Sequence, residues 1–255
     1  MDVFYLITFF LLGLFLGMIY TSIGKKLPNH ESIFHLDNMC SKCFHKLSFL
    51  EMIPIFSYIF LQGRCKHCHS KIDDLYTYME LFTGILFAFA YYAFGISFEL
   101  LIALGIVSML MIISVSDMTY YIIPDEVLIF FSGYFIIINC ISKGLNYSLF
   151  SILSGIFLFI LMYIVMWLGS VIFKKECLGG GDVKMMFVFG LVLHPVLGLI
   201  SIFIGSLLAL PISLLMLWSK NEKMVPFGPF LLISFTFIYF TKIDFNMILD
   251  FLRLK

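Results

Sequence analysis

Apolar residues run along most of this chain in long stretches, and short polar segments separate them. The pattern predicts eight membrane-crossing candidates, over residues 3–23, 76–95, 98–116, 126–141, 147–173, 184–195, 196–218 and 226–241. Crossing the hydrocarbon takes about 20 apolar residues, or fewer where a segment is buried among others. We therefore predict an all-α polytopic membrane protein with about eight transmembrane helices. The sixth stretch is short, and we expect it to form a bent pair with the seventh at His194-Pro195.

Composition supports the membrane interpretation. Hydrophobic residues make up 62% of the 255-residue chain and charged residues only 13%, which a soluble core does not require. The formal net charge is zero, so no global basic field indicates nucleic acid binding. Only the acidic Asp2 precedes the first stretch, which carries no basic region or small-residue cleavage site, so we expect a retained helix.

Positive charges in the polar segments predict the orientation. Cytoplasmic loops carry an excess of lysine and arginine. With the amino terminus outside and eight crossings, twelve of the 16 lysines and arginines fall inside, and the opposite orientation reverses that ratio. Both chain ends should then face outward. The same topology places Asp117 at the inner end of the third helix and Asp182 at the inner start of the sixth. This agreement is independent, because the topology rests on lysine and arginine alone.

These two aspartates are the strongest candidates for chemistry. A carboxylate at the edge of a membrane helix is costly, and Asp182 follows three glycines, in Gly179-Gly180-Gly181-Asp182-Val183-Lys184. The glycines allow close approach of another segment. Two adjoining carboxylates can share one proton and activate a water, one as base and the other as acid. The sequence therefore predicts aspartic hydrolysis inside a membrane.

Structural interpretations compete with the catalytic one at each acidic position. Asp117 alone could solvate a helix end, and Asp182 could be the N-cap of the sixth helix. Asp125 is explained by capping of the fourth helix. Lys184 could tune the acidity of Asp182, bind a substrate carboxylate or anchor the inner leaflet. Glu80, about one turn inside the second helix, is either functional or snorkels to the surface.

The one long polar segment, residues 24–75, lies on the cytoplasmic side in this topology. It contains two C-x-x-C pairs separated by 21 residues, a spacing typical of a four-thiolate zinc ribbon. Four thiolates leave no open position for a substrate water, so the zinc should be structural. Free or disulfide-bonded cysteines are the alternative, and a reducing cytoplasm disfavours disulfides. The predicted ligands are Cys40, Cys43, Cys65 and Cys68.

Other potential ligands lie nearby or stand alone. His45, His67 and His69 are close to the thiolates, and exposed or supporting roles are favoured over replacement of a ligand. Cys140 should pack within the fourth helix, and Cys177 has no identifiable partner. The chain thus divides into a first transmembrane helix (1–23), a cytoplasmic zinc-binding loop (24–75) and a transmembrane aspartic peptidase core (76–255).

At this level of detail the chain resembles the type IV prepilin peptidases, which are GxGD intramembrane aspartic proteases. The resemblance begins with Asp117 and its following Ile123-Pro124-Asp125, together with the Gly179 to Lys184 motif. It covers most of the chain in the same order. The further matching segments are Gly13 to Pro28, Leu50-Glu51-Met52-Ile53-Pro54, Ser57-Tyr58, Gly63-Arg64-Cys65, Tyr76 to Thr83 and Pro226-Phe227-Gly228-Pro229-Phe230.

The resemblance implies a bifunctional enzyme of the bacterial inner membrane. Family members cleave the basic leader of prepilins and pseudopilins after a glycine at the cytoplasmic face, and many then methylate the new amino terminus with S-adenosylmethionine. Asp117 and Asp182 match the catalytic pair, the four cysteines match the zinc ligands, and the 24–75 loop is the methyltransferase part. The first knuckle has Ser41-Lys42 where the family has a proline, and His67 also departs from the pattern.

Alternatives remain at the level of activity. No glycine-rich nucleotide fingerprint of the usual kind is present. Methylation therefore rests on the resemblance, and a peptidase without it is an alternative. A preflagellin-type peptidase is disfavoured by the cysteine-bearing loop. A transporter or receptor with a zinc-ribbon loop would explain the helices and cysteines but leave both aspartates and the glycine motif without a role.

Overall fold

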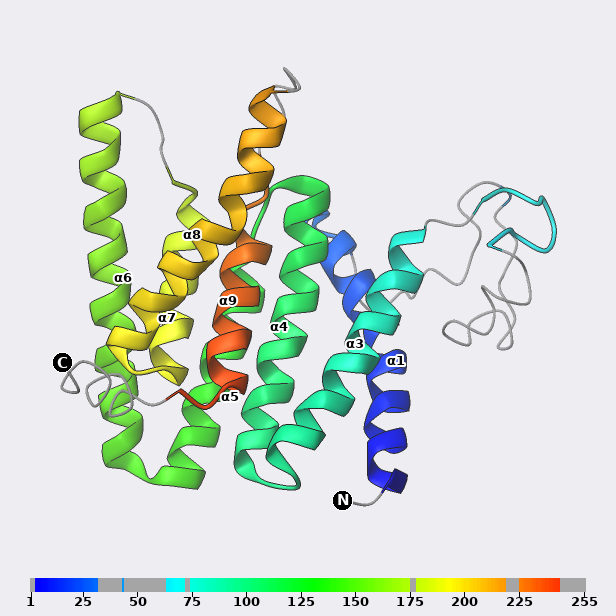
Figure 1. The fold of residues 1–255 in the computed structure, drawn as a ribbon, viewed down its shortest axis with the longest axis horizontal. Coiled ribbons are helices and arrows are strands. Elements are labelled where there is room, and N and C mark those ends of the chain that lie inside the picture. The colour runs from blue at the N-terminus through cyan, green and yellow to red at the C-terminus, as the bar shows by residue number, and fades with distance from the viewer. Residues whose placement is uncertain are drawn as a thin grey trace. The chain divides into compact units, whose positions relative to one another are not determined.

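The computed structural model describes residues 3–31, 43, 63–71, 74–174, 178–218 and 225–243. These residues form eight α-helices and one short 3₁₀-helix (Figure 1). Each α-helix coincides with one of the eight predicted stretches, so the all-α fold is confirmed. The elements are α1 (Val3–Lys26), η1 (Leu27–Asn29), α3 (Asp74–Phe94), α4 (Phe98–Tyr120), α5 (Asp125–Lys143), α6 (Leu145–Phe173), α7 (Gly180–Val192), α8 (Pro195–Trp218) and α9 (Gly228–Phe240).

Seven of the eight described α-helices fall into two classes by length, and α3, with 21 residues, belongs to neither. Five segments among the described residues are long and apolar enough to cross a membrane: 3–29, 98–120, 125–143, 145–173 and 195–216. By contrast, α7 and α9 have 13 residues each. At 1.5 Å per residue they extend about 20 Å, less than the roughly 30 Å of hydrocarbon in a bilayer. The short sixth stretch was expected, and the chain breaks between α7 and α8 at Leu193-His194.

Two of the helix ends that differ from the predicted boundaries carry the aspartates. Helix α4 continues to Tyr120, so Asp117 lies inside its last turn. Helix α7 begins at Gly180, so Asp182 lies inside its first turn. An apolar stretch ends at the first charged residue, but backbone hydrogen bonds continue past it. The N–H of Tyr121 still donates to the carbonyl of Asp117 at 3.0 Å.

The chain divides into two compact units, residues 1–100 and 101–255. In the first unit, α1 packs on α3 through small residues. A Cβ placed on Gly13 would lie 2.8 Å from the Cα of Gly84, and one on Gly17 would lie 2.8 Å from the Cα of Glu80. Such close backbone approach is typical of helix pairs in membranes.

In the second unit, α7 is held on several sides. Its Gly190 approaches α6 so closely that an added Cβ would lie 2.5 Å from the Cα of Gly155. The ring of Phe189 stacks on Phe235 of α9 with centroids 4.1 Å apart. The Nδ2 of Asn139 on α5 donates to the carbonyl of Leu191 at 2.8 Å. These contacts fix α7, and with it the position of Asp182.

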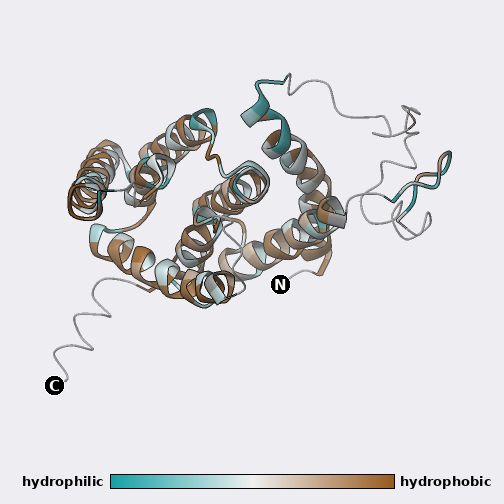
Figure 2. Cartoon of the chain, turned by 90° about the horizontal axis from the view of Figure 1, so that it is seen from above, coloured by the Kyte–Doolittle hydropathy of each residue, from teal (hydrophilic) through white to brown (hydrophobic). Residues whose placement is uncertain are grey.

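Apolar side chains cover much of the outer surface of the helices. Hydropathy colouring shows apolar residues dominating the helix bodies (Figure 2). Helix α6 exposes a run of large apolar residues that a soluble protein would bury: Phe157, Ile160, Trp167, Ile172 and Phe173. Lipid is the solvent that suits such a surface, so the chain is a membrane protein.

Candidate active site

Asp117 is buried at the junction of α4 and α9. Its side chain is 6% exposed. Its Oδ2 accepts a hydrogen bond of 2.9 Å from the backbone N–H of Gly228, the first residue of α9. The amides at a helix N-terminus carry partial positive charge and lack partners within their own helix. Asp117 therefore satisfies one of these donors while the helix end offsets part of the cost of its burial.

Asp182 occupies the corresponding place at the N-terminus of α7. It is 8% exposed, and its carboxylate accepts a hydrogen bond from the backbone N–H of Gly179. Gly179 is the N-cap, so the interpretation of Asp182 as the N-cap residue is wrong. Asp182 is the third helical residue, from which a carboxylate reaches back to the cap amide. Its Oδ1 is buried and has no hydrogen-bond partner among the described residues.

The fold brings the two predicted aspartates together within the second unit. Asp117 and Asp182 are 65 positions apart in the sequence, and their carboxylates are close enough to repel each other electrostatically. Two neighbouring carboxylates do not both ionise cheaply at close range, so such a pair favours holding one proton between them. The arrangement has the parts needed to activate a water and to protonate a leaving group.

The turn after α4 lies beside both carboxylates. It is anchored by Ser116, whose Oγ donates to the carbonyl of Ile122 at 2.5 Å. Tyr121 takes a left-handed conformation with φ of 58° and ends the helix. A Cβ on Gly181 would lie 2.8 Å from the Cβ of Ile123, and one on Gly228 would lie 3.4 Å from its Cδ1. The side chain of Ile123 therefore lies against the first turn of α7, and its tip lies near Gly228 at the start of α9.

Lys184 and Asp125 form an ion pair at the same end of the unit. The Nζ of Lys184 lies 2.8 and 2.7 Å from the two carboxylate oxygens of Asp125, and both side chains are about half exposed. The N-cap of α5 is Pro124, and it makes no side-chain cap hydrogen bond. The capping interpretation of Asp125 is therefore wrong. It joins the N-terminal turn of α5 to that of α7.

Glu80 belongs to the first unit. It is 8% exposed on α3, opposite Gly17 of α1. A snorkelling side chain would reach water, so the burial of Glu80 disfavours that interpretation.

Three of the four predicted metal ligands lie in the described residues, and they converge. The Sγ atoms of Cys43, Cys65 and Cys68 all lie within 4.8 Å of one another. The second pair sits in a tight turn, in which the N–H of Cys65 donates to Ser70 and the N–H of His69 donates back to Cys65, both at 2.9 Å. This cluster could bind a metal ion. Cys40, His45 and Cys177 lie outside the described residues.

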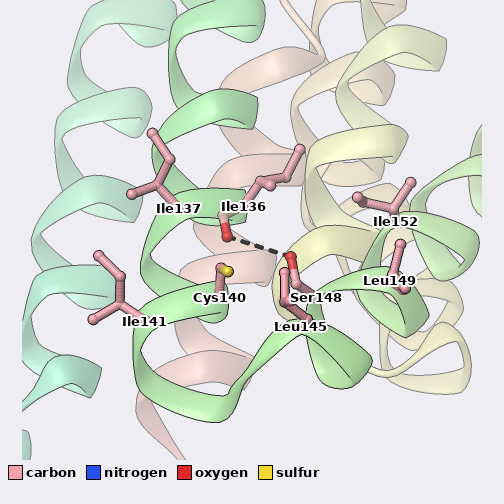
Figure 3. A pocket seen from close by; sticks show the side chains of 8 residues that line it. All are labelled: Ile136, Ile137, Cys140, Ile141, Leu145, Ser148, Leu149 and Ile152. Carbon is pink, nitrogen blue, oxygen red and sulfur yellow. Dashed lines mark hydrogen bonds between the residues drawn. The ribbon is translucent and has the colours of Figure 1, made fainter.

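The remaining candidates carry no comparable chemistry. His67 and His69 are exposed on the second knuckle. Cys140 lines an apolar pocket of about 340 Å³ between α5 and α6 (Figure 3). That pocket lies toward the far end of α5 from Asp125, and its polar lining is limited to Cys140 and Ser148, whose Oγ donates to Ile136 at 3.4 Å. The packing role expected of Cys140 agrees with this position.

Sequence reasoning did not single out Ile123, Ser116 or the amide of Gly228 as parts of the site. The isoleucine and the glycine were noted only as matching segments, because an apolar side chain and a backbone amide carry no chemical signal in a sequence. Gly228 does lie next to Pro229 at the start of an apolar stretch, which marks a helix N-terminus and thus a source of free amides.

Comparison with known proteins finds two family matches along the chain. Residues 11–94 match the Bacterial Peptidase A24 N-terminal domain, and residues 104–214 match the Type IV leader peptidase family. The second match contains Asp117 and Asp182, and the first contains the cysteine-bearing segment. No solved structure matches the chain.

Individual relatives share one name, prepilin leader peptidase/N-methyltransferase. The Bacillus subtilis protein is 37% identical over 186 residues, which cover 72% of this chain and 72% of that protein. The Stutzerimonas stutzeri protein is 30% identical over 212 residues, covering 80% and 71%. The Pseudomonas aeruginosa protein is 29% identical over 225 residues, covering 84% and 75%. With this identity over most of both chains, the protein belongs to the type IV leader peptidase family.

Proposed function

We propose that this protein is an aspartic endopeptidase that removes the leader of type IV prepilins or pseudopilins, with Asp117 and Asp182 as its catalytic pair. The observation that carries the proposal is the meeting of two buried carboxylates, each bonded to the N-terminal amide of a different helix. The relatives are named for the same activity.

The chemistry follows from a pair that shares one proton. The ionised carboxylate takes a proton from a water, and the oxygen of that water attacks the carbonyl carbon of the scissile peptide. The protonated carboxyl donates its proton to the carbonyl oxygen. The tetrahedral intermediate then collapses: the nitrogen receives the proton that came from water, the second carboxylate takes a proton back from one hydroxyl, and the C–N bond breaks. The Oδ1 of Asp182 supports this role, because it is buried without a hydrogen-bond partner among the described residues and a shared proton would satisfy it.

The substrate is brought to this site by its own topology. A prepilin held by an apolar helix with its basic leader in the cytoplasm presents the scissile bond, after a glycine, at the inner face of the membrane. The lysine and arginine distribution predicts that Asp117 and Asp182 lie at that face of the bacterial inner membrane. The substrate partner is thus a membrane-held protein, and nucleic acid plays no part.

A second activity is proposed from the names of the relatives. We propose that the protein N-methylates the new amino terminus with S-adenosylmethionine, and that residues 24–75 take part. We further propose that Cys40 completes a four-thiolate zinc site with the three cysteines that converge in the structure. Zinc would hold the loop together, since four thiolates leave no ligand position for chemistry.

The deciding experiment is leader cleavage by purified enzyme in detergent. Asp117→Asn and Asp182→Asn should each lower the cleavage rate by about 10²- to 10⁴-fold, the usual contribution of general acid–base catalysis. Glu126→Gln, an exposed carboxylate close by in the sequence, is the matched control and should cleave normally. Cleavage that survives both Asp→Asn substitutions in folded protein would refute Asp117 and Asp182 as the catalytic pair. A folded wild-type protein that cleaves no prepilin would instead favour a transporter or receptor.

Methylation is tested on the same product. Cleavage in the presence of S-adenosylmethionine should raise the mass of the new amino-terminal peptide by one methyl group. A product of unchanged mass, with leader removal intact, would leave a peptidase without methyltransferase activity.

A further inference from the structure

We propose that Ile123 is a positioning residue that sets the separation of the two catalytic carboxylates. It acts as a spacer between the N-terminal turns of α7 and α9. The inference rests on the proposed function, because it concerns the same pair of aspartates.

The first observation is the contact with α7. The three heavy atoms nearest to an added Cβ on Gly181 all belong to Ile123, at 2.8 Å for its Cβ, 3.2 Å for its Cδ1 and 3.3 Å for its Cγ1. The isoleucine side chain therefore lies directly on the α7 backbone at the residue before Asp182. Any approach of α7 toward the turn is limited by this contact.

The second observation is the contact with α9. An added Cβ on Gly228 would lie 2.9 Å from Asp117 Oδ2 and 3.4 Å from the Cδ1 of Ile123. The tip of the same side chain thus faces the helix end whose amide holds Asp117. One isoleucine therefore lies next to the two backbone positions that locate the two carboxylates.

The spacer is fixed at both of its ends. On one side, Ser116 binds the carbonyl of Ile122, and the left-handed Tyr121 ends α4 four residues after Asp117. On the other side, Pro124 is buried and restricts the backbone. Asp125 then ties the chain to α7 through Lys184. Ile123 therefore cannot move aside without breaking these contacts, and its volume determines the gap that it fills.

The separation matters because it controls how the pair titrates. Repulsion between like charges rises as their distance falls. Stronger repulsion moves the two macroscopic proton dissociations of a carboxylate pair further apart, and these appear as the acid and alkaline limbs of the pH–rate profile. A smaller spacer should bring the carboxylates closer and so move the two limbs apart. A residue that only stabilised the fold would leave them in place.

The first test is Ile123→Ala in the leader-cleavage assay, with thermal unfolding measured in parallel. We expect kcat to fall about 10- to 100-fold, because small misplacements of catalytic groups have effects of this size. KM should change less than about threefold, since the spacer makes no substrate contact in this proposal. The two limbs should move apart by at least half a pH unit.

Ile123→Val keeps the Cβ contact and shortens the tip, so it should show smaller shifts. It provides the same test if the alanine variant does not fold. Ile129→Ala, an exposed position on α5, is the control.

The second test is suppression. Gly181→Ala should inactivate the enzyme by collision with Ile123, whereas Gly180→Ala should be tolerated because nothing lies within 4 Å of the added Cβ. Adding Ile123→Gly to Gly181→Ala should recover at least tenfold in rate. Adding Ile123→Ala should recover less, because it keeps the colliding Cβ. Ile123→Gly should not rescue Gly228→Ala, whose nearest neighbour is Asp117.

The outcomes separate the two proposals. If the Asp→Asn variants are inactive but folded Ile123→Ala and Ile123→Val keep the wild-type limbs, the positioning role is refuted and the peptidase remains. Failure of Ile123→Gly to improve a folded Gly181→Ala enzyme also overturns it. If the Asp→Asn variants retain activity, both proposals fall.

Discussion

Replacing Gly228 by alanine tests the link between α9 and the catalytic pair. The N–H of Gly228 donates to Asp117 Oδ2 at 2.9 Å, and an added Cβ would lie 2.9 Å from the same oxygen. Carbon and oxygen atoms that are not bonded do not remain that close, so the carboxylate must shift away by a few tenths of an ångström. The shift weakens or breaks a hydrogen bond to a charged group, which contributes about 1.5–3 kcal/mol.

That energy converts directly into a rate. If the bond is needed in the transition state, Gly228→Ala should lower the rate of leader cleavage by about 10- to 150-fold, since each 1.36 kcal/mol is tenfold. The assay is the initial rate of appearance of the shortened prepilin, with thermal unfolding as the check on folding. Gly133→Ala is the control, because its added Cβ meets nothing within 4 Å in the interior of α5. It should keep full activity and gain about 0.5–1 kcal/mol in stability. A folded Gly228→Ala enzyme with wild-type activity would refute the reasoning.

Two further predictions concern polar contacts away from the carboxylates. The ion pair is about half exposed, so Lys184→Met or Asp125→Asn should cost at most about 1 kcal/mol in the free energy of unfolding. The double variant Asp125→Lys with Lys184→Asp exchanges the two charges and should recover most of that free energy of unfolding. If its unfolding curve shows no recovery, the ion pair does not stabilise the fold. For the cysteine cluster, we expect about one zinc per chain by metal analysis. Cys65→Ser should lose the metal and make the loop sensitive to protease, while Cys140→Ser should leave the metal content unchanged; a Cys65→Ser protein with full zinc would contradict the site.

The sequence was sufficient to predict the helical architecture, because lipid imposes a strong rule on it. Backbone groups in hydrocarbon must bond internally, so each long apolar stretch has little choice but to be helical. The ends of the helices were less predictable. Asp117 and Asp182 were placed outside their helices because a charge interrupts the apolar pattern. The helices nevertheless extend past those charges, since each carboxylate finds a backbone amide from another segment or its own cap.

The site was predictable only as far as its titratable groups. Two aspartates at the same predicted membrane face could be paired from topology alone. The contacts that set their geometry involve an isoleucine and glycine backbone, which have no distinctive pattern in one sequence. For Asp125, by contrast, the sequence predicted a local role that the structure does not show. An acidic residue after Pro124 has the pattern of a cap, but Asp125 pairs with Lys184 instead. That lysine lies 59 residues away in the sequence, so no local pattern predicts the pair.

Helices α7 and α9 are short, and their short length lowers the free-energy cost of burying two carboxylates. A helix that crosses the whole bilayer carries its N-terminus, with its unpaired amides, out to water. Helices of 13 residues cannot reach both surfaces, and here Gly181 in the first turn of α7 and the buried Gly228 at the start of α9 both lie near Ile123 in the turn after α4. Each turn supplies one amide to one aspartate, from Gly179 to Asp182 and from Gly228 to Asp117. The positive ends of two helices thereby oppose both the desolvation of the carboxylates and their mutual repulsion. The sixth stretch is too short to cross the bilayer, and the helix that it forms begins beside the two aspartates.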